Sequence, residues 1–384
     1  MKQTNKTKAM LFIICKINMI AATIISSRSV STGLKAIRTL VLVIMFAAGV
    51  VANIDAASKN LRVVAQFTNS AFGATAAIAD TDIWAVGDST STNQTLAVRF
   101  DGRSWSVVPT PTLAASSLAG VSAVASNDVW AVGGQTVSGT ANTLIEHWNG
   151  TTWSVVTSPT PVGGGSLAAV AALSSTDVWA VGTQSQISGD LVEHWDGTSW
   201  SIVSSAAFTG NDFLNGISAD ASNDVWAVGQ NFATSGAVIL HWDGQTWSRL
   251  DFSSKSVVGL LAVTALSPTN VWAVGAKPGP PPGDIAAVIQ HWDGTSWNFV
   301  PSPNPDPIGN LSRLTGIAAV SANNIFAVGD AHNGPFTEHW NGGSWRLTNT
   351  PSGVAGFNGV TALSDGTVVA VGGETDGSAI ILEN

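Results

Sequence analysis

The amino-acid sequence predicts an all-β protein, a seven-bladed β-propeller made of four-stranded antiparallel blades. Three observations lead to this fold class. A phrase like DVWAVG recurs at intervals of 43 to 54 residues, and a phrase like HWDGTSW follows every copy except the last. Only 11% of the residues are charged. Helices need charged residues on their solvent-exposed faces, so this composition favours strands and turns.

The first phrase defines seven units. Six copies begin at Asp82, Asp128, Asp177, Asp224, Asn270 and Asn324, and a weaker copy, TVVAVG, begins at Thr367. Their spacing matches a four-stranded blade, which takes roughly 40–50 residues. After its first residue the phrase is apolar at every position, which is typical of a strand buried on both faces. We therefore predict that it forms the second strand of each blade, between two neighbouring blades.

The other three strands of a blade follow from the unit around Trp130. The segment LAGVSAVA (118–125) precedes the phrase as the first strand, TLIEHW (143–148) follows it as the third, and WSVV (153–156) is the fourth. A Ser-Asn-Asp turn joins the first two strands and Asn-Gly-Thr-Thr joins the last two. Nothing after the leader has a sustained 3.6-residue pattern, so no helix is expected there.

The HWDGTSW phrase predicts a tight hairpin between the third and fourth strands. Asp or Asn at the first turn position accepts hydrogen bonds from nearby backbone amides, and Gly supplies the positive φ. The two Trp residues then face each other across the hairpin. All 16 Trp occupy three repeat positions, which leaves none in a loop to stack on a ligand.

The ends of the chain predict ring closure. The seventh unit stops after its third strand, SAIILEN, and has no fourth. The segment LRVV (61–64) precedes the first unit and resembles WSVV, with Leu61 in the Trp position. We expect strand 61–64 to pair with strand 378–383 and to remove the open sheet edges. An open solenoid would need atypical capping repeats, and none is visible.

Residues 1–57 have the composition of a secretory leader, and residues 58–384 form the predicted propeller. A basic start and apolar stretches precede an uncharged run from Thr39 to Ile54, which is shorter than the roughly 20 residues that span a bilayer. The protein is thus expected to be secreted or displayed at the cell surface, with membrane contact only through the leader. Met19 is an alternative start, and an uncleaved anchor is an alternative reading of the leader.

Cleavage of this leader would remove the single cysteine, Cys15, so disulfides are not expected. The remaining nine basic and 24 acidic side chains give a net charge of −15. No cluster of Lys or Arg exists after residue 62, which argues against nucleic-acid binding. We expect a monomer.

The Asp-Gly-Thr-Ser-Trp turn resembles the Asp-box of bacterial neuraminidase-repeat propellers, although Asp293 and Gly294 are adjacent here. The combined phrases resemble those of secreted bacterial repeat proteins over residues 61–384. The Asp-box resemblance implies a propeller fold, and a sialidase activity would imply a Tyr nucleophile and three arginines. The chain has no Tyr, so that activity is excluded.

Repeated polar residues are predicted to be structural. His147, His194, His241, His291 and His339 share one repeat position, and equivalent positions lie far apart around a ring. A metal or acid–base ring is therefore disfavoured against packed strand residues bonded to the Asp that opens the second strand. Asp128, Asp177 and Asp224 are read as turn caps. No motif for a metal, a cofactor or a catalytic nucleophile is found.

Ligand binding is expected on the face that carries the irregular loops, between strands two and three and between blades. Its richest sector surrounds blades five and six, at 278–284 and 301–313. The candidate residues are Asp284, Asp306, Arg313, Asp330, His332, Glu374, Asp376 and Asp88. The predicted function is a binding module for a glycan or a protein. A glycan-active hydrolase or lyase using two carboxylates is the alternative, and a purely structural repeat protein with an apolar, plugged tunnel is the third.

Overall fold

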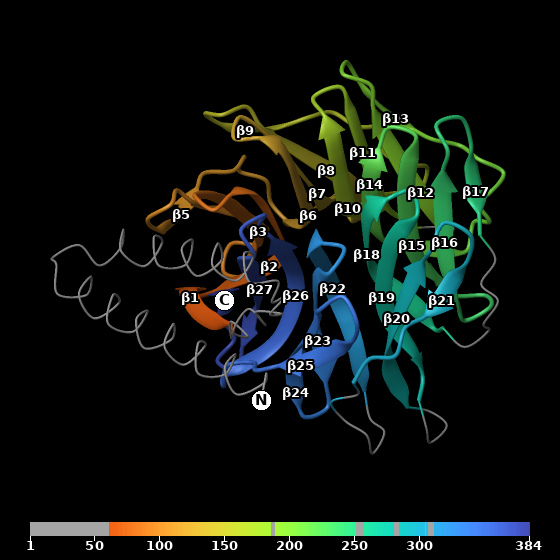
Figure 1. The fold of residues 1–384 in the computed structure, drawn as a ribbon. Helices are drawn as coiled ribbons and strands as arrows, with labels where there is room; N and C mark the ends of the chain where they lie inside the picture. Colours follow the sequence, from red (N-terminus) through yellow and green to blue (C-terminus); the bar gives the residue numbers. More distant parts are fainter. Residues whose placement is uncertain (1–60, 186–188, 251–256, 280–283, 304, 306–310) are drawn as a thin grey trace, which may run out of the picture. The chain divides into compact units, whose positions relative to one another are not determined.

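The computed structural model describes residues 61–384 except 186–188, 251–256, 280–283, 304 and 306–310. The chain divides into two compact units, Met1–Lys59 and Asn60–Asn384, and the description concerns the second unit. The predicted leader lies outside the described residues. Within them the protein consists of seven four-stranded antiparallel sheets with no helix, as predicted. The sheets are arranged as blades in a ring (Figure 1).

Each blade contains four strands in sequence order. Blades 1 to 3 comprise β2 (Ser70–Ala79), β3 (Asp82–Ser89), β4 (Gln94–Phe100) and β5 (Trp105–Val108); β6 (Ser116–Ala125), β7 (Asp128–Val137), β8 (Thr140–Trp148) and β9 (Trp153–Val155); and β10 (Gly165–Ser174), β11 (Asp177–Gln184), β12 (Gly189–Trp195) and β13 (Trp200–Ile202). Blades 4 to 6 comprise β14 (Asp212–Ala221), β15 (Asp224–Asn231), β16 (Gly236–Trp242) and β17 (Trp247–Arg249); β18 (Gly259–Ser267), β19 (Asn270–Pro278), β20 (Ile285–Trp292) and β21 (Trp297–Phe299); and β22 (Ser312–Ser321), β23 (Asn324–Ala331), β24 (Gly334–Trp340) and β25 (Trp345–Thr348).

The seventh blade combines both ends of the described chain, in the order β26 (Val354–Ala362), β27 (Val368–Glu374), β28 (Ala379–Glu383) and β1 (Arg62–Phe67). Strand β1 pairs with β28 from Arg62 opposite Glu383 to Phe67 opposite Ala379. Leu61, in the predicted Trp position, is buried against the blade. The predicted closure is confirmed, and the pairing continues three residues beyond the predicted segment 61–64.

The second strands are buried on both faces, as their composition predicts. Val129, Ala131 and Val132 in β7 have no exposed surface. The final Gly of the phrase is fixed by a close backbone approach, because a Cβ atom on Gly133 would lie 2.0 Å from the carbonyl oxygen of Ser117 in the first strand. Each first strand also contains a bulge next to this contact, between Leu118 and Gly120 in β6.

The hairpin turns have the predicted geometry. In the HWDGTSW turn, an Asp293 carboxylate oxygen accepts hydrogen bonds from the backbone amides of Thr295 at 2.8 Å and Ser296 at 2.9 Å. Gly294 has a φ of 93°, which an L-residue rarely adopts. These hydrogen bonds, with one from the Thr295 hydroxyl, hold the pKa of Asp293 below its usual range. The acid at this position therefore shapes the turn.

The two Trp residues of each hairpin face each other, and a third Trp from the preceding blade packs against both. Trp148 and Trp153 are cross-strand partners with ring centroids 6.0 Å apart. Trp84 of blade 1 lies 5.1 Å from the ring of Trp148 and 5.2 Å from that of Trp153. The sequence predicted the pair inside the hairpin but not the third ring. The aromatic groups therefore join neighbouring blades.

This triad recurs at five blade-to-blade seams. The centroids of the second-strand Trp and the two hairpin Trp lie between 5.1 and 5.8 Å apart in the sets Trp84–Trp148–Trp153, Trp130–Trp195–Trp200, Trp179–Trp242–Trp247, Trp226–Trp292–Trp297 and Trp272–Trp340–Trp345. Such edge-to-face and tilted contacts add roughly 0.5–1.5 kcal/mol each beyond burial.

The repeated histidines are packed strand residues. His147 lies 4.2 Å from the Trp130 ring in the same blade, and its Nε2 is 2.8 Å from an Asp128 carboxylate oxygen. His194 and His241 make the same contact with Asp177 and Asp224. This confirms the predicted bond between the histidine and the Asp that opens the second strand, whereas the turn-cap role predicted for the same three acids is not seen among the described residues. Each acid stands two residues before the Trp that is paired with the histidine across the second and third strands.

Removing the closing strand tests the ring. Deletion of residues 60–66 is expected to lower the thermal midpoint and to promote aggregation, because the edge of β28 is then unpaired. The measurements are circular dichroism melting and light scattering. The double variant Val63→Ser and Val64→Ser is the control, since these side chains are 38% and 37% exposed. An unchanged melting profile for the deletion would contradict the closure.

Removing one indole tests the seams. Trp226→Ala is expected to lower the free energy of unfolding by about 3–5 kcal/mol, because a buried ring is lost from between two others. Trp226→Phe should cost less, since Phe326 holds the corresponding place in blade 6. Urea denaturation measures both. Val107→Ala, at a 57% exposed position, is the control, and an equal effect of Trp226→Ala and this control would refute the inter-blade role.

Candidate functional site

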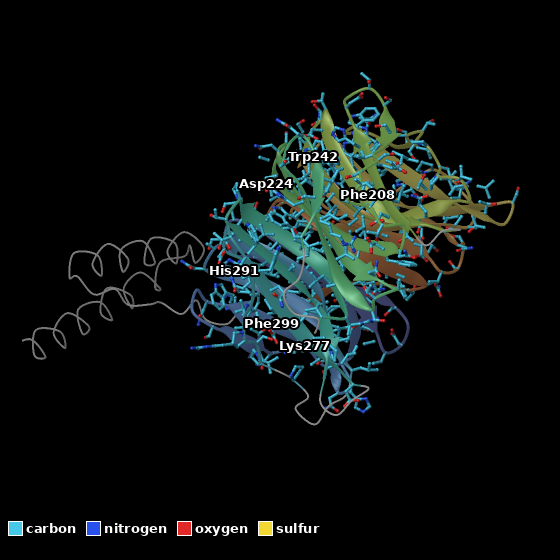
Figure 2. All side chains as sticks on the ribbon, turned by 90° about the vertical axis from the view of Figure 1, so that its right-hand side faces the viewer. Phe208, Asp224, Trp242, Lys277, His291 and Phe299 are labelled. Carbon is cyan, nitrogen blue, oxygen red and sulfur yellow. The ribbon has the colours of Figure 1, made fainter. Side chains whose placement is uncertain are left out.

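The antiparallel strand order gives the propeller two different faces. The loops between second and third strands and the connectors between blades share one side, which we call the loop face. The turns between first and second strands and the third–fourth hairpins share the other side, which we call the turn face. Figure 2 shows Lys277 and Phe299 close together and apart from Asp224 and His291, which belong to the turn face.

Two predicted site residues, Arg313 and Asp330, lie opposite each other across β22 and β23. The Arg313 Nη2 and Asp330 Oδ2 atoms are 3.6 Å apart. The other Asp330 oxygen accepts a hydrogen bond of 3.1 Å from the backbone amide of Phe357. Asp330 therefore links blade 6 to blade 7.

Glu374 and Asp376 lie together at the closure of the ring. The side-chain amide of Gln66 donates to a Glu374 oxygen at 2.9 Å and to an Asp376 oxygen at 3.2 Å. Hydrogen bonds from the Ser378 hydroxyl and backbone hold the pKa of Asp376 below its usual range. The Gln66 amide contacts both acids, so these carboxylates support the closing strand.

The other four predicted residues lie apart from these two groups. Asp88 ends β3 at the position that Asp330 has in blade 6, and burial raises its pKa. His332 is exposed in the turn after β23. The carbonyl of Asp284 accepts a hydrogen bond from the Gly279 amide. Asp306 lies outside the described residues. A ligand role for the eight residues stays a prediction.

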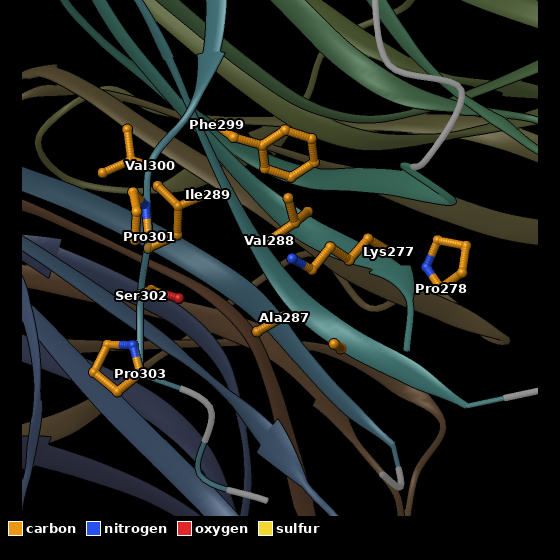
Figure 3. Close-up of a pocket in the computed structure, with 11 residues that line it drawn as sticks. Lys277, Pro278, Ala287, Val288, Ile289, Phe299, Val300, Pro301, Ser302 and Pro303 are labelled. Carbon is orange, nitrogen blue, oxygen red and sulfur yellow. The ribbon is translucent and has the colours of Figure 1, made fainter. Parts of the chain in front are cut away.

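A pocket of about 660 Å³ opens on the loop face of blade 5. Figure 3 shows the connector residues Val300, Pro301 and Pro303 on one side and Lys277 and Pro278 on the other. Strand β20 forms the floor, from Ala286 to Ile289. The Lys277 ammonium lies 5.2 Å from the centre of the Phe299 ring, a distance suited to a cation–π contact.

Next to this pocket, blade 5 lacks a contact that blades 1 and 2 have. In blade 1, the Thr95 hydroxyl donates to that of Thr110 at 3.0 Å, and the same position in blade 2 brings the hydroxyls of Thr143 and Ser158 within 3.1 Å. Blade 5 has Ala287 in place of this threonine, and the matching connector residue, Ser302, lines the pocket. The third strand and the connector are joined here by the Val300 amide, which donates to the Ile289 carbonyl at 3.1 Å, and not by hydroxyl groups.

Sequence reasoning found this sector but not these residues. The segments 278–284 and 301–313 begin at the pocket, while Lys277, Ala287 and Phe299 were not among the predicted residues. The position of Ala287 varies between blades, with threonine in blades 1 and 2 and alanine again in blades 4 and 7, so the sequence gives no clear signal there.

Three glutamates are buried at blade seams. Glu146, Glu193 and Glu338 have no exposed surface, and no hydrogen bond of ordinary geometry reaches their carboxylates from the described residues. Burial raises the pKa of Glu146 to about 7 and those of Glu193 and Glu338 to about 8, although a neighbouring hydroxyl acts in the opposite direction. These acids hold a proton near neutral pH.

A pair of carboxyl groups lies between blades 3 and 4. Burial, followed by the nearby Asp212, raises the pKa of Asp190 to about 7. Burial acts to raise the pKa of Asp212 as well, but Arg249, Asp190 and Asn231 lower it on balance. Both residues are buried. The Asp212 carboxylate accepts hydrogen bonds from the Arg249 guanidinium and the Asn231 amide, so it is engaged within the seam.

The central tunnel offers a ligand few polar groups. Its cavity of about 170 Å³ is lined by first strands, mainly through Gly, Ala, Val, Ile and Leu. Asn215, Thr315 and Asn358 donate to backbone carbonyls of the next blade at 3.0, 2.8 and 2.7 Å. The polar side chains of the tunnel thus join blades.

Neither a metal cluster nor a membrane-crossing helix is found in the described part of the chain. Its His, Cys, Asp and Glu side chains form no group of three or more that could hold a metal ion. None of its segments forms a helix of the length and hydropathy needed to span a bilayer.

Solved structures share the fold at low sequence identity. No protein-family model and no curated protein matches the chain. A structure described as YCF48 bound to D1 peptide is 16% identical, covers 84% of this chain and 96% of that chain, and has a TM-score of 0.56. YCF48 from Cyanidioschyzon merolae is 13% identical, with 84% and 98% covered and a TM-score of 0.57. A six-bladed fucose-recognising lectin of the fungus Aleuria aurantia is 16% identical, with 75% and 99% covered and a TM-score of 0.49. These identities show the fold alone.

The buried glutamates predict a pH-dependent stability. From the usual pKa of 4.5 up to about 8, Glu338 keeps its proton when folded and loses it when unfolded. Stability therefore falls by about 1.4 kcal/mol per pH unit as the pH rises through this window. Glu338→Gln removes this loss, and Gln290 already occupies the same position in blade 5. We expect the variant to be more stable by about 4 kcal/mol at pH 8 and nearly unchanged at pH 4.

Urea denaturation at both pH values measures this effect. Asp220→Asn, at an exposed position near the end of β14, is the matched control that removes an acid without burial. A Glu338→Gln variant with the parental pH dependence would contradict the assignment.

Proposed function

We propose that the protein is a binding module and that its ligand occupies the loop face of blade 5. The observation that supports this proposal is the pocket between β20 and the connector of residues 299–303. Its volume of about 660 Å³ falls within the range of roughly 300–1,000 Å³ that is typical of ligand sites. The pocket lies on strand β20, and this strand belongs to a four-stranded blade of the ring.

The lining favours an extended protein segment over a glycan. The walls are mostly proline, valine and phenylalanine, and the polar side chains are those of Lys277 and Ser302. A glycan needs a denser set of directed hydrogen bonds. In the floor, the Ile289 carbonyl accepts from the Val300 amide and the Ala287 amide donates to the Ser312 hydroxyl. An extended segment would therefore bind here mainly through its side chains.

The charge of the pocket favours an acidic partner. Lys277 is the only lysine in the described residues, and the protein around it is acidic. Its ammonium contacts a ring face, with no carboxylate within ion-pair distance in the described residues. We infer a ligand with a carboxylate beside apolar side chains. The structure described as YCF48 bound to D1 peptide is a precedent for a peptide ligand on this fold.

The proposal includes the setting in which the module works. The leader composition of residues 1–57 supports export, followed by release or display at the cell surface. The acidic, cysteine-free remainder fits an extracellular monomer of the kind found among secreted bacterial repeat proteins.

Filling the pocket tests the proposal. The full chain is applied to an array of acidic, neutral and basic heptapeptides and to a glycan array. We expect acidic peptides with apolar residues to bind. Ala287→Thr, which restores the threonine of blades 1 and 2, and Lys277→Gln should each weaken binding by about tenfold or more, or about 1.4 kcal/mol.

Arg103→Gln removes a positive charge from the turn face and is the control that should leave binding unchanged. Binding to glycans alone would refute the peptide ligand. Peptide binding that survives both pocket variants would refute the site.

A further inference from the structure

The seam between blades 7 and 1 lacks the indole that fills five other seams. Val369 stands where Trp130 stands in blade 2, since each lies in the same register of the second strand. The hairpin that faces it in blade 1 carries Phe100 and Trp105, whose ring centroids are 5.5 Å apart. Two aromatic walls are therefore present without the ring that normally lies against them.

A pocket of about 310 Å³ lies at this seam, on the turn face. Phe100, Trp105 and Ile83 of blade 1 line it together with Val369 and Thr367 of blade 7. Trp105 is half-buried, as is Trp297 at the same position in blade 5, whereas Trp153, Trp200, Trp247 and Trp345 are buried. The space corresponds to the place of the missing indole.

The charges at this seam are also reversed. In blades 1 to 6 a basic side chain lies opposite the second-strand aromatic residue: Arg99 in blade 1 and a histidine in the others. The Arg99 guanidinium lies 5.1 Å from the centre of the Trp84 ring. In blade 7 the residue opposite Val369 is an acid, Glu383.

Glu383 lines the pocket, as do Asp80 and Asp365, and no basic side chain does. Asp365 is engaged by its own turn, where it accepts from Thr367. Arg62 is opposite Glu383 on β1, but it is exposed and no ion pair joins the two in the described structure. The pocket therefore combines aromatic walls with carboxylates.

We propose that this seam binds an arylalkylammonium group, an aromatic ring joined by a short linker to a protonated amine. The ring takes the place of the missing indole against Phe100 and Trp105. The amine takes the place of the basic side chain that six blades supply themselves, and it pairs with Glu383. This site is on the face opposite to the proposed peptide pocket and does not depend on it.

Equilibrium dialysis of the full chain against tryptamine tests the proposal. We expect a Kd of about 0.1–1 mM, as suits a small ligand with one ring and one charge. Indole-3-propionate has the same ring and a negative charge, and it should bind at least tenfold more weakly. The peptides Lys-Trp-Lys and Glu-Trp-Glu then distinguish a free amine from a partner's side chains. The proposal is supported if either tryptamine or Lys-Trp-Lys binds, even when the other does not. It is overturned if neither of them binds.

Two variants assign the binding to this seam. Val369→Trp supplies the missing indole from the chain itself and should abolish tryptamine binding while the far-ultraviolet circular dichroism is retained. Glu383→Gln keeps the shape of the pocket and should weaken tryptamine at least tenfold while leaving neutral indole unchanged. Phe326→Trp adds an indole at the next seam and is the control that should bind as the parent does.

The variants also keep the proposal falsifiable if one of them misfolds. Glu383→Gln is a substitution of a partly exposed residue at the end of a strand, so its folding does not depend on filling a cavity. Tryptamine binding that is equal in the parent and in Glu383→Gln would overturn the proposal. So would equal affinity for tryptamine and indole-3-propionate.

Discussion

The packing of an indole from one blade into the hairpin of the next is the interaction on which the propeller depends. A four-stranded sheet of this size has two apolar faces and cannot cover them alone. The triads cover these faces with rings in tilted and edge-to-face contact, and the histidine–aspartate contact orients the central ring from its own blade. With a small charged fraction and a chain that is cysteine-free from Asn60 onward, stability has to come from these seams. Because the aromatic residues are engaged in this way, ligand contacts arise mainly where the pattern is interrupted.

The fold was predictable because each blade repeats the same local information. Three features of the sequence had a direct physical interpretation, and the structure contains all three. They are the phrase that is apolar on both faces, the turn with Asp293 and Gly294, and the last strand that lacked a partner in its own unit. The third ring of the triad was not predictable, because nothing in a single repeat states which neighbour a second-strand Trp faces. For Asp128, the predicted bond to His147 is present in the structure, whereas the predicted turn-cap role is not seen.

A ligand role for the predicted site residues stays a prediction. These charged residues lie on irregular loops, and several of them join blades in the structure, as with Asp330 and the Phe357 amide or Gln66 with Glu374. Neither pocket could be found from these charges: one lies beside Ala287, and the other beside Val369, which stands where five blades have Trp. Comparing repeats for missing volume is therefore more informative here than searching for chemistry. The two pockets also differ in charge, with an ammonium in one and carboxylates in the other.

The pairing of strand β1 with strand β28 has a consequence for the synthesis and folding of the protein. Gln66 and Glu374 are 308 residues apart in sequence and in contact in space. During synthesis β1 emerges before the six blades that follow it, and its partner β28 emerges after them. The opening strand must wait while six complete blades form, so the ring can be sealed only once β28 has been made. Long-range pairings of this kind form slowly and leave sheet edges open to wrong partners in the meantime. A nascent propeller of this design therefore benefits from a chaperone or from delayed folding until β28 is available.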